Sequence, residues 1–213
     1  MRSYLHSCGP LKIKLPIMSA SQNCSMKIGL MGGSFNPMHE GHISVAKEAI
    51  RRLNFDQIWL LVTPGNPLKP SLELAPLQER IKNVQEKIRY RRIKALSIEE
   101  ELGSHFTANL IYYLKGRCSG VKFVWIMGAD NLASFHLWNH WALIVNQVPV
   151  LIIDRPGWRF KALSSRVARR IASCRLKEER CKNLFQHTTP VWAFLTNRLL
   201  SDSSTKIRRI AQK

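Results

Sequence analysis

Apolar and polar residues alternate along the chain in two different rhythms. Short runs of consecutive apolar residues recur, and between them lie longer segments in which apolar residues return every three or four positions. The first pattern is typical of buried strands and the second of amphipathic helices. The strand-like runs are 27–31, 57–62, 93–98, 122–127, 149–153 and 191–195, and the helical segments are about 41–53, 76–90, 106–117, 131–147 (as two short pieces) and 164–180, with a last short helix from about 203 to the end.

This alternation predicts parallel strands joined by crossover helices. The run 123–127 is apolar at every position, as expected of a strand that is covered on both faces. We therefore predict a single α/β domain over residues 26–213, of the Rossmann-like, doubly wound form with a parallel sheet. Residues 1–25 contain prolines, a glycine and many serines with little periodicity, so we expect a disordered leader, or a natural start at Met18 or Met26.

No run is long and apolar enough to cross a membrane, and residues 1–25 lack the apolar segment and cleavage site of a signal peptide. The five cysteines are scattered and form no C-x-x-C pair, so neither a disulfide framework nor a zinc site is predicted. Free thiols fit a reducing compartment, and we expect a cytoplasmic protein with no membrane partner. Whether it forms a homo-oligomer stays open.

Charge is strongly positive and uneven. The net charge is +19, and residues 155–213 hold 15 Lys and Arg against three acids. We consider three interpretations, in descending order of weight: a solvated helix face, steering of anionic substrates towards a phosphate site, and binding of nucleic acid. The first places Arg166, Arg169, Arg170 and Arg175 on one helix, with Val167, Ala168 and Ile171 beneath them.

The segment 32–42 reads Gly-Gly-Ser-Phe-Asn-Pro-Met-His-Glu-Gly-His and joins a predicted strand to a predicted helix. Backbone N–H groups and the positive end of a helix dipole converge at such a turn, which favours phosphate. His39 and His42 add imidazole donors. The glycine spacing is neither a dinucleotide fingerprint nor a P-loop. A metal site on the two histidines would need a third ligand, and none is evident.

Three other segments can join this site. Gly128-Ala129-Asp130 follows the strand 122–127, and the two loops meet over one crevice if the two strands are neighbours. The loop 63–70 is stiffened by prolines and presents Asn66 and Lys69. The segment 203–208 predicts a helix start with cations in its first turn, where acids are usual, so the charge is expected to face an anion.

The pattern G-x-F-x-P-x-H-x-G-H resembles the signature of the nucleotidyltransferase superfamily. Four further segments, 62–69, 104–107, 128–141 and 153–157, are similar to those of the bacterial nicotinate-nucleotide adenylyltransferase family, and the resemblance covers roughly residues 26–210. Two departures stand out: Asp202 occupies the place of an isoleucine, and Pro67-Leu68-Lys69 lacks the family's histidine.

The resemblance implies adenylyl transfer from ATP to nicotinate mononucleotide, which gives deamido-NAD and pyrophosphate, with Mg²⁺ bound through the phosphates. A nicotinamide-mononucleotide or phosphopantetheine adenylyltransferase is the alternative, and a basic nucleic-acid-binding protein ranks lower. The implied catalytic residues are His39, His42 and Arg208. The implied ATP site comprises Gly32, Gly33, Ser34, Phe35, His39, His42, Gly128, Asp130, Ser204, Thr205 and Arg208, and the implied nicotinate-mononucleotide site comprises Asn66, Lys69, Thr107, Trp138 and Arg155.

Overall fold

The computed structural model describes residues 15–16, 25–65, 74–104 and 106–196. Within these ranges seven parallel strands form one sheet, in the order β3-β2-β1-β4-β5-β7-β6. The strands are β1 (Lys27–Gly33), β2 (Gln57–Val62), β3 (Ile93–Leu96), β4 (Lys122–Gly128), β5 (Val150–Ile153), β6 (Arg175–Leu176) and β7 (Trp192–Leu195). The strand order confirms the predicted doubly wound α/β fold.

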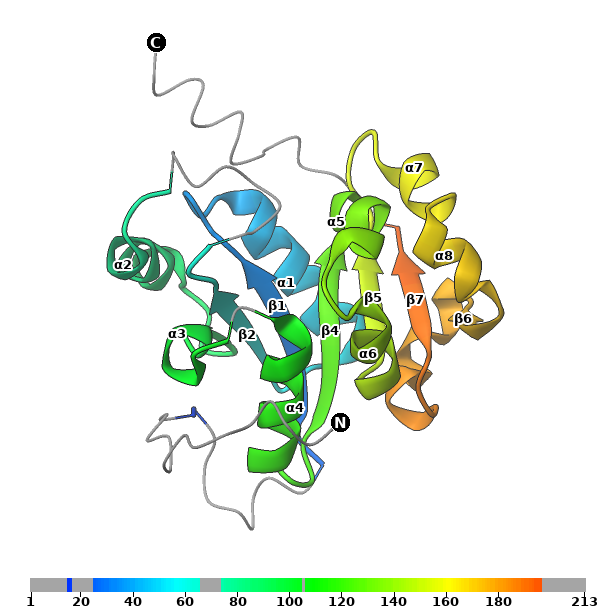
Figure 1. Ribbon diagram of the computed structural model, residues 1–213, viewed down its shortest axis with the longest axis horizontal. Coiled ribbons are helices and arrows are strands. Elements are labelled where there is room, and N and C mark those ends of the chain that lie inside the picture. Colours follow the sequence, from blue (N-terminus) through cyan, green and yellow to red (C-terminus); the bar gives the residue numbers. More distant parts are fainter. Residues whose placement is uncertain (1–14, 17–24, 66–73, 105, 197–213) are drawn as a thin grey trace.

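Helices cover both faces of the sheet, which runs through the middle of the molecule (Figure 1). On one face pack α1 (Glu40–Leu53), α2 (Leu77–Lys87) and the 3₁₀ segment η5 (Glu178–Gln186). On the other face pack α4 (Thr107–Arg117), α5 (Ala129–Ser134), η3 (Phe135–Leu137), α6 (Trp141–Gln147), α7 (Arg159–Leu163) and α8 (Arg166–Arg170). The short elements α3 (Glu99–Leu102) and η4 (Ala172–Cys174) complete the set that the structure describes.

The core is therefore two apolar layers separated by the sheet. In β4, Phe123, Trp125 and Met127 enter one layer, whereas Val124 and Ile126 enter the other. All five side chains are buried, which confirms that the run 123–127 is a central strand covered on both faces. Burying a large apolar side chain contributes roughly 1.5–3 kcal/mol, so this strand is a main support of the sheet.

The predicted helix over 164–180 is wrong. The chain forms α8, η4, β6 and the start of η5 instead. The carbonyl oxygen of Ile171, which a continuing helix would use to accept from Arg175, accepts from Trp192 Nε1 at 2.7 Å. Arg175 pairs with Trp192 in the ladder between β6 and β7, and its guanidinium lies 5.2 Å from the centre of the Trp192 ring. Contacts with β7 thus end the helix and remove Arg175 from the basic face.

Three described residues of the predicted leader contact the domain. The Ser25 N–H donates to the Gly120 carbonyl at 3.1 Å. Leu15 packs against the core layer that contains Trp125, and the Pro16 carbonyl accepts from Gln57 Nε2 at 3.3 Å. In the described part of the chain, no helix combines the length and the apolar character needed to cross a membrane. The helix predicted from about 203 lies outside the described residues.

Candidate active site

The strand order reverses between β1 and β4, and this point defines the candidate site. The two strands are paired from Lys27↔Lys122 to Leu30↔Trp125. Each ends three residues later on a glycine, Gly33 in β1 and Gly128 in β4. The loops that follow these glycines lie at the same edge of the sheet, where ligands bind in open α/β folds. The two strands are therefore neighbours, which is the condition under which the sequence analysis places the two loops over one crevice.

His39 and His42 hold the start of α1 through reciprocal caps. The His39 Nδ1 accepts from the Gly41 N–H at 3.1 Å, and the His42 Nδ1 accepts from the His39 N–H at 3.3 Å. The two ring centroids are 3.8 Å apart. Because each Nδ1 accepts a backbone hydrogen bond, the neutral rings carry their protons on Nε2. The reciprocal caps thus fix the orientation of two imidazoles at the helix start.

The two histidines differ in exposure. His39 is only 4% exposed and serves as the N-cap of α1, whereas His42 is half-buried one turn further on. The His42 ring meets the buried Phe35 ring edge-on, with 5.0 Å between centroids. Phe35 has a left-handed backbone, φ +46°, which costs free energy in a bulky residue and is typical of a turn held by its surroundings. Of the two imidazoles, His42 is therefore the more exposed.

At the end of β4, Asp130 and Arg155 form an ion pair over Gly128. Arg155 Nη1 lies 2.7 Å from Asp130 Oδ2, and each side chain is about a quarter exposed. A Cβ at Gly128 would lie 2.4 Å from Asp130 Oδ1, so a side chain at this position would have to displace the ion pair. The sequence analysis assigned Arg155 to the mononucleotide site and Asp130 to the ATP site. The structure places the two side chains in contact.

The aromatic segment around Trp138 is linked to the glycine motif through Trp125. The Trp138 ring contacts Trp125 and Phe135 edge-on, at centroid distances of 6.2 and 5.2 Å. A Cβ at Gly32 would lie 2.8 Å from Trp125 Cη2, so Gly32 lets this indole approach the backbone of β1. Trp138 is half-buried and rests on a fixed aromatic base.

The start of α4 belongs to the same region. Phe106, the residue before α4, meets the His140 ring at 5.8 Å, and His140 lies two residues after Trp138. Thr107 is the first residue of α4, whose first turn contains no acid. Backbone N–H groups at such a helix start attract a carboxylate. The structure thus brings Thr107 and the Trp138 segment together.

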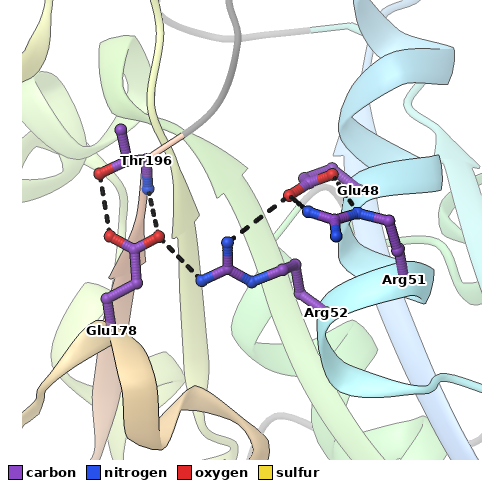
Figure 2. Close-up of polar contacts among 5 residues, drawn as sticks. All are labelled: Glu48, Arg51, Arg52, Glu178 and Thr196. Atoms are coloured by element: carbon purple, nitrogen blue, oxygen red, sulfur yellow. Dashed lines mark hydrogen bonds and ion pairs between the residues drawn. The ribbon is translucent and has the colours of Figure 1, made fainter.

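Five predicted site residues, Asn66, Lys69, Ser204, Thr205 and Arg208, lie outside the described residues. The last described residue, Thr196, follows β7 and is tied to α1 by a polar network (Figure 2). The Glu178 carboxylate accepts from the Thr196 N–H at 3.1 Å, from the Thr196 hydroxyl at 2.9 Å, and from Arg52 at 2.8 Å. Arg52 also lies 3.8 Å from Glu48. The end of β7 is therefore fastened to the helix that starts with the histidine motif.

The sequence analysis missed two buried polar groups near the site. Arg80 in α2 is 3% exposed, and Asp154 at the end of β5 is 2% exposed and holds Arg159 of α7, with Arg159 Nε at 2.7 Å. The signal for Arg80 was present, because it falls on the apolar stripe of α2 three residues after Leu77 and four before Val84. A cation on an apolar stripe indicates either that its charge is buried with hydrogen-bond partners or that the buried face of the helix has been predicted wrongly.

Comparison with known proteins identifies the family of this chain. The family model described as Cytidylyltransferase-like matches residues 30–210. A relative from Brucella abortus, named "Probable nicotinate-nucleotide adenylyltransferase", is 46% identical over 188 residues, which cover 88% of this chain and 97% of the relative. A relative of the same name from Cereibacter sphaeroides is 44% identical and covers 86% and 96%. The chain belongs to the nicotinate-nucleotide adenylyltransferase family.

The fold also resembles a solved structure, Plasmodium falciparum nicotinic acid mononucleotide adenylyltransferase complexed with NaAD. The TM-score is 0.64 at 19% sequence identity, and the match covers 86% of this chain and 83% of the other. At this identity the likeness concerns the fold.

Proposed function

We propose that this protein transfers AMP from ATP to nicotinate mononucleotide, giving deamido-NAD and pyrophosphate, in NAD biosynthesis. One observation carries the proposal: the two imidazoles at the start of α1 are held by reciprocal caps at the point where the strand order reverses. That geometry suits a triphosphate. The acceptor follows from relatives that are 44–46% identical and carry the name of this reaction.

The mononucleotide's 5′-phosphate is the nucleophile. One of its oxygens attacks the α-phosphorus of ATP in line, the bond to the bridging oxygen breaks, and pyrophosphate leaves with the electron pair. The attacking phosphate is ionised at neutral pH, so the reaction needs neither a general base nor a covalent enzyme intermediate. Catalysis then comes from positioning the two phosphates and from stabilising the charge that develops between them.

On the ATP side, we assign His42 to the phosphate nearest the transferring group, because it is half-buried whereas His39 is buried as the helix cap. His39 holds the geometry and supplies a second imidazole. Gly32, Gly33, Ser34 and Phe35 contribute backbone N–H groups, Gly128 and Asp130 meet the adenosine, and Ser204, Thr205 and Arg208 close on the β- and γ-phosphates.

On the acceptor side, Trp138 stacks on the pyridine ring and backbone N–H groups around Thr107 receive the carboxylate. The contacts Trp125–Trp138 and Phe106–His140 support this assignment because they keep the indole and the start of α4 in one region. Asn66 and Lys69 are assigned to the mononucleotide. The ion pair with Asp130 supports a place for Arg155 between the two nucleotides.

Mg²⁺ is the metal we propose, carried in by ATP. Among the described residues, no three His, Cys, Asp or Glu side chains form a group that could hold a metal ion. Magnesium is commonly held by substrate phosphates, water and one or two carboxylates, so it needs no protein cage. Its ligands here would be phosphate oxygens, and when bound it neutralises their charge. The free thiols of Cys118, Cys174 and Cys181 support a reducing compartment, and we place the reaction in the cytoplasm.

A pyrophosphate-release assay tests the proposal, with ATP and three acceptors: nicotinate mononucleotide, nicotinamide mononucleotide and phosphopantetheine. We expect the acid to exceed the amide by at least about tenfold in kcat/KM, because an NH₂ group against a donor costs of order 1–3 kcal/mol. Equal values for acid and amide would remove the nicotinate assignment but leave adenylyl transfer. A preference for phosphopantetheine would replace the acceptor altogether.

A further inference from the structure

Arg80 is a buried cation whose partners are backbone carbonyls. None of the ion pairs among the described residues includes it. Its guanidinium donates to four carbonyl oxygens: Nε to Ala75 at 2.8 Å, Nη1 to Ser34 at 2.8 Å and to Thr63 at 2.7 Å, and Nη2 to Pro64 at 2.9 Å. Burial lowers the pKa of this guanidinium, and the pKa starts so high that the charge persists. A buried charge is costly, and hydrogen bonds that use most of its five N–H donors offset that cost.

The four carbonyls come from three separate stretches of chain. Ser34 lies in the glycine motif after β1, Thr63 and Pro64 lie directly after β2, and Ala75 lies just before α2. One rigid, planar group therefore joins the loop that carries the two histidines to the loop that leads towards Asn66 and Lys69. A lysine has a single nitrogen on a flexible stem and cannot span the same set of acceptors.

Other contacts from the same side hold the histidine loop. Lys87, at the end of α2, donates from Nζ to the Met38 carbonyl at 2.6 Å. The Ala75 N–H donates to Asn36 Oδ1 at 3.3 Å. With the Arg80 contact to Ser34, the loop is attached at three places between β1 and α1. Phe35, with its left-handed backbone, lies directly after the first of these places.

The Arg80 contact also sets the direction of a backbone donor. In a trans peptide the carbonyl and the following N–H point in opposite directions. Because the Ser34 carbonyl points at Arg80, the Phe35 N–H points away from α2. The same holds for the Pro64 carbonyl and the Gly65 N–H. Each loop thus turns one N–H away from the guanidinium, and Phe35 is among the residues assigned to the ATP phosphates.

We propose that Arg80 is a positioning residue for adenylyl transfer, which locks the histidine loop to the loop after β2 and aims the Phe35 N–H at the triphosphate. The inference rests on the proposed function, since it assigns the two loops to ATP and to the mononucleotide. It goes beyond that function by placing a required group on α2, with no contact to substrate. Loss of Arg80 then affects turnover through loop geometry, while each loop keeps its own ligand contacts.

The test compares Arg80→Lys with Lys82→Met, which removes an exposed cation from the same helix. We measure kcat and both KM values by pyrophosphate release, and the folded fraction by far-UV circular dichroism at the assay temperature. Per folded molecule, we expect Arg80→Lys to lower kcat at least about tenfold, with both KM values within about threefold, because misaimed donors lose mainly transition-state contacts. Lys82→Met should match wild type.

Two further arms separate positioning from folding. In Arg80→Ala, methylguanidinium should restore part of kcat, and methylammonium of equal charge should not. Lys87→Met removes an exposed side chain that holds the same loop, and it should lower kcat about threefold or more with little change in KM, even if the Arg80 variants fail to fold. The proposal would be overturned if folded Arg80→Lys had a normal kcat, or if its loss of activity were confined to KM. It would also be overturned if the Arg80 variants did not fold and Lys87→Met had a normal kcat. If the wild-type enzyme does not use nicotinate mononucleotide as an acceptor, the proposed function fails. The Arg80 variants are then assayed with whichever of the three acceptors the wild-type enzyme does use.

Discussion

Glu99 is a buried carboxyl group that takes part in none of the ion pairs among the described residues, and it makes stability depend on pH. It is the first residue of α3, next to the buried Ile98, and is 4% exposed. Burial raises its pKa from 4.5 to about 7. In the unfolded chain the same group returns to its ordinary pKa. The folded state therefore holds the proton more tightly than the unfolded state, and the carboxylate form costs free energy only in the folded state.

The sign and size of the effect follow from these two pKa values. Below pH 4.5 both states are protonated and the carboxyl group carries no penalty. As the pH rises from 4.5 to about 7, Glu99 ionises in the unfolded state but stays protonated in the folded state. The free energy of unfolding therefore falls by about 1.4 kcal/mol per pH unit. Above pH 7 the loss is constant, at about 3 kcal/mol. We expect Glu99→Gln, which is neutral at every pH, to escape this loss.

Urea unfolding at pH 5, 6, 7 and 8 measures the effect. Relative to wild type, Glu99→Gln should gain stability steadily between pH 5 and 7 and then level off, with a total gain of about 2–3 kcal/mol. Glu100→Gln, on the exposed side of the same short helix, is the matched control and should show no such trend. A difference between Glu99→Gln and wild type that stays flat with pH, or shrinks as pH rises, would refute the reasoning, because it would mean that Glu99 is ionised in the folded state at low pH.

Three further predictions concern the site itself. His42→Ala should lower kcat by about 10²–10³ with a smaller change in KM for ATP, as expected for a donor that acts on the developing charge; normal turnover with weaker ATP binding would make His42 a ground-state contact. Trp138→Ala should weaken binding of nicotinate mononucleotide in calorimetry and leave ATP binding nearly unchanged, since we propose that Trp138, which packs on Trp125, stacks on the pyridine ring; an equal loss for both ligands would argue for general unfolding of the aromatic segment. Gly32→Ala places a Cβ 2.8 Å from Trp125 Cη2, so we expect thermal unfolding to show a loss of roughly 1–3 kcal/mol, and an unchanged melting temperature would contradict the packing.

The local chemistry of the site could be predicted from the sequence, because it depends on neighbours along the chain. The turn 32–42 contains its own glycines, its own helix start and both imidazoles, and the reciprocal caps of His39 and His42 span only three residues. All described strands except β6, and most of the longer helices, were predicted for a similar reason, since periodicity records which face of an element is buried. The alternation of strands and helices predicted the doubly wound form, and the structure supplied the order of the strands.

Tertiary structure decided whatever depends on partners far apart in the sequence. The predicted helix ends at Ile171 because its carbonyl accepts a hydrogen bond from the Trp192 indole N–H, 21 residues away in the sequence. Arg155 met Asp130 across 25 residues. Arg80 found a carbonyl 46 residues away at Ser34 and became part of the support under the histidine loop. Periodicity shows that a position is buried but does not identify its partner. The sequence by itself therefore determined most of the elements and the glycine and histidine motif. Only tertiary packing decided which distant side chains hold these elements and loops in place.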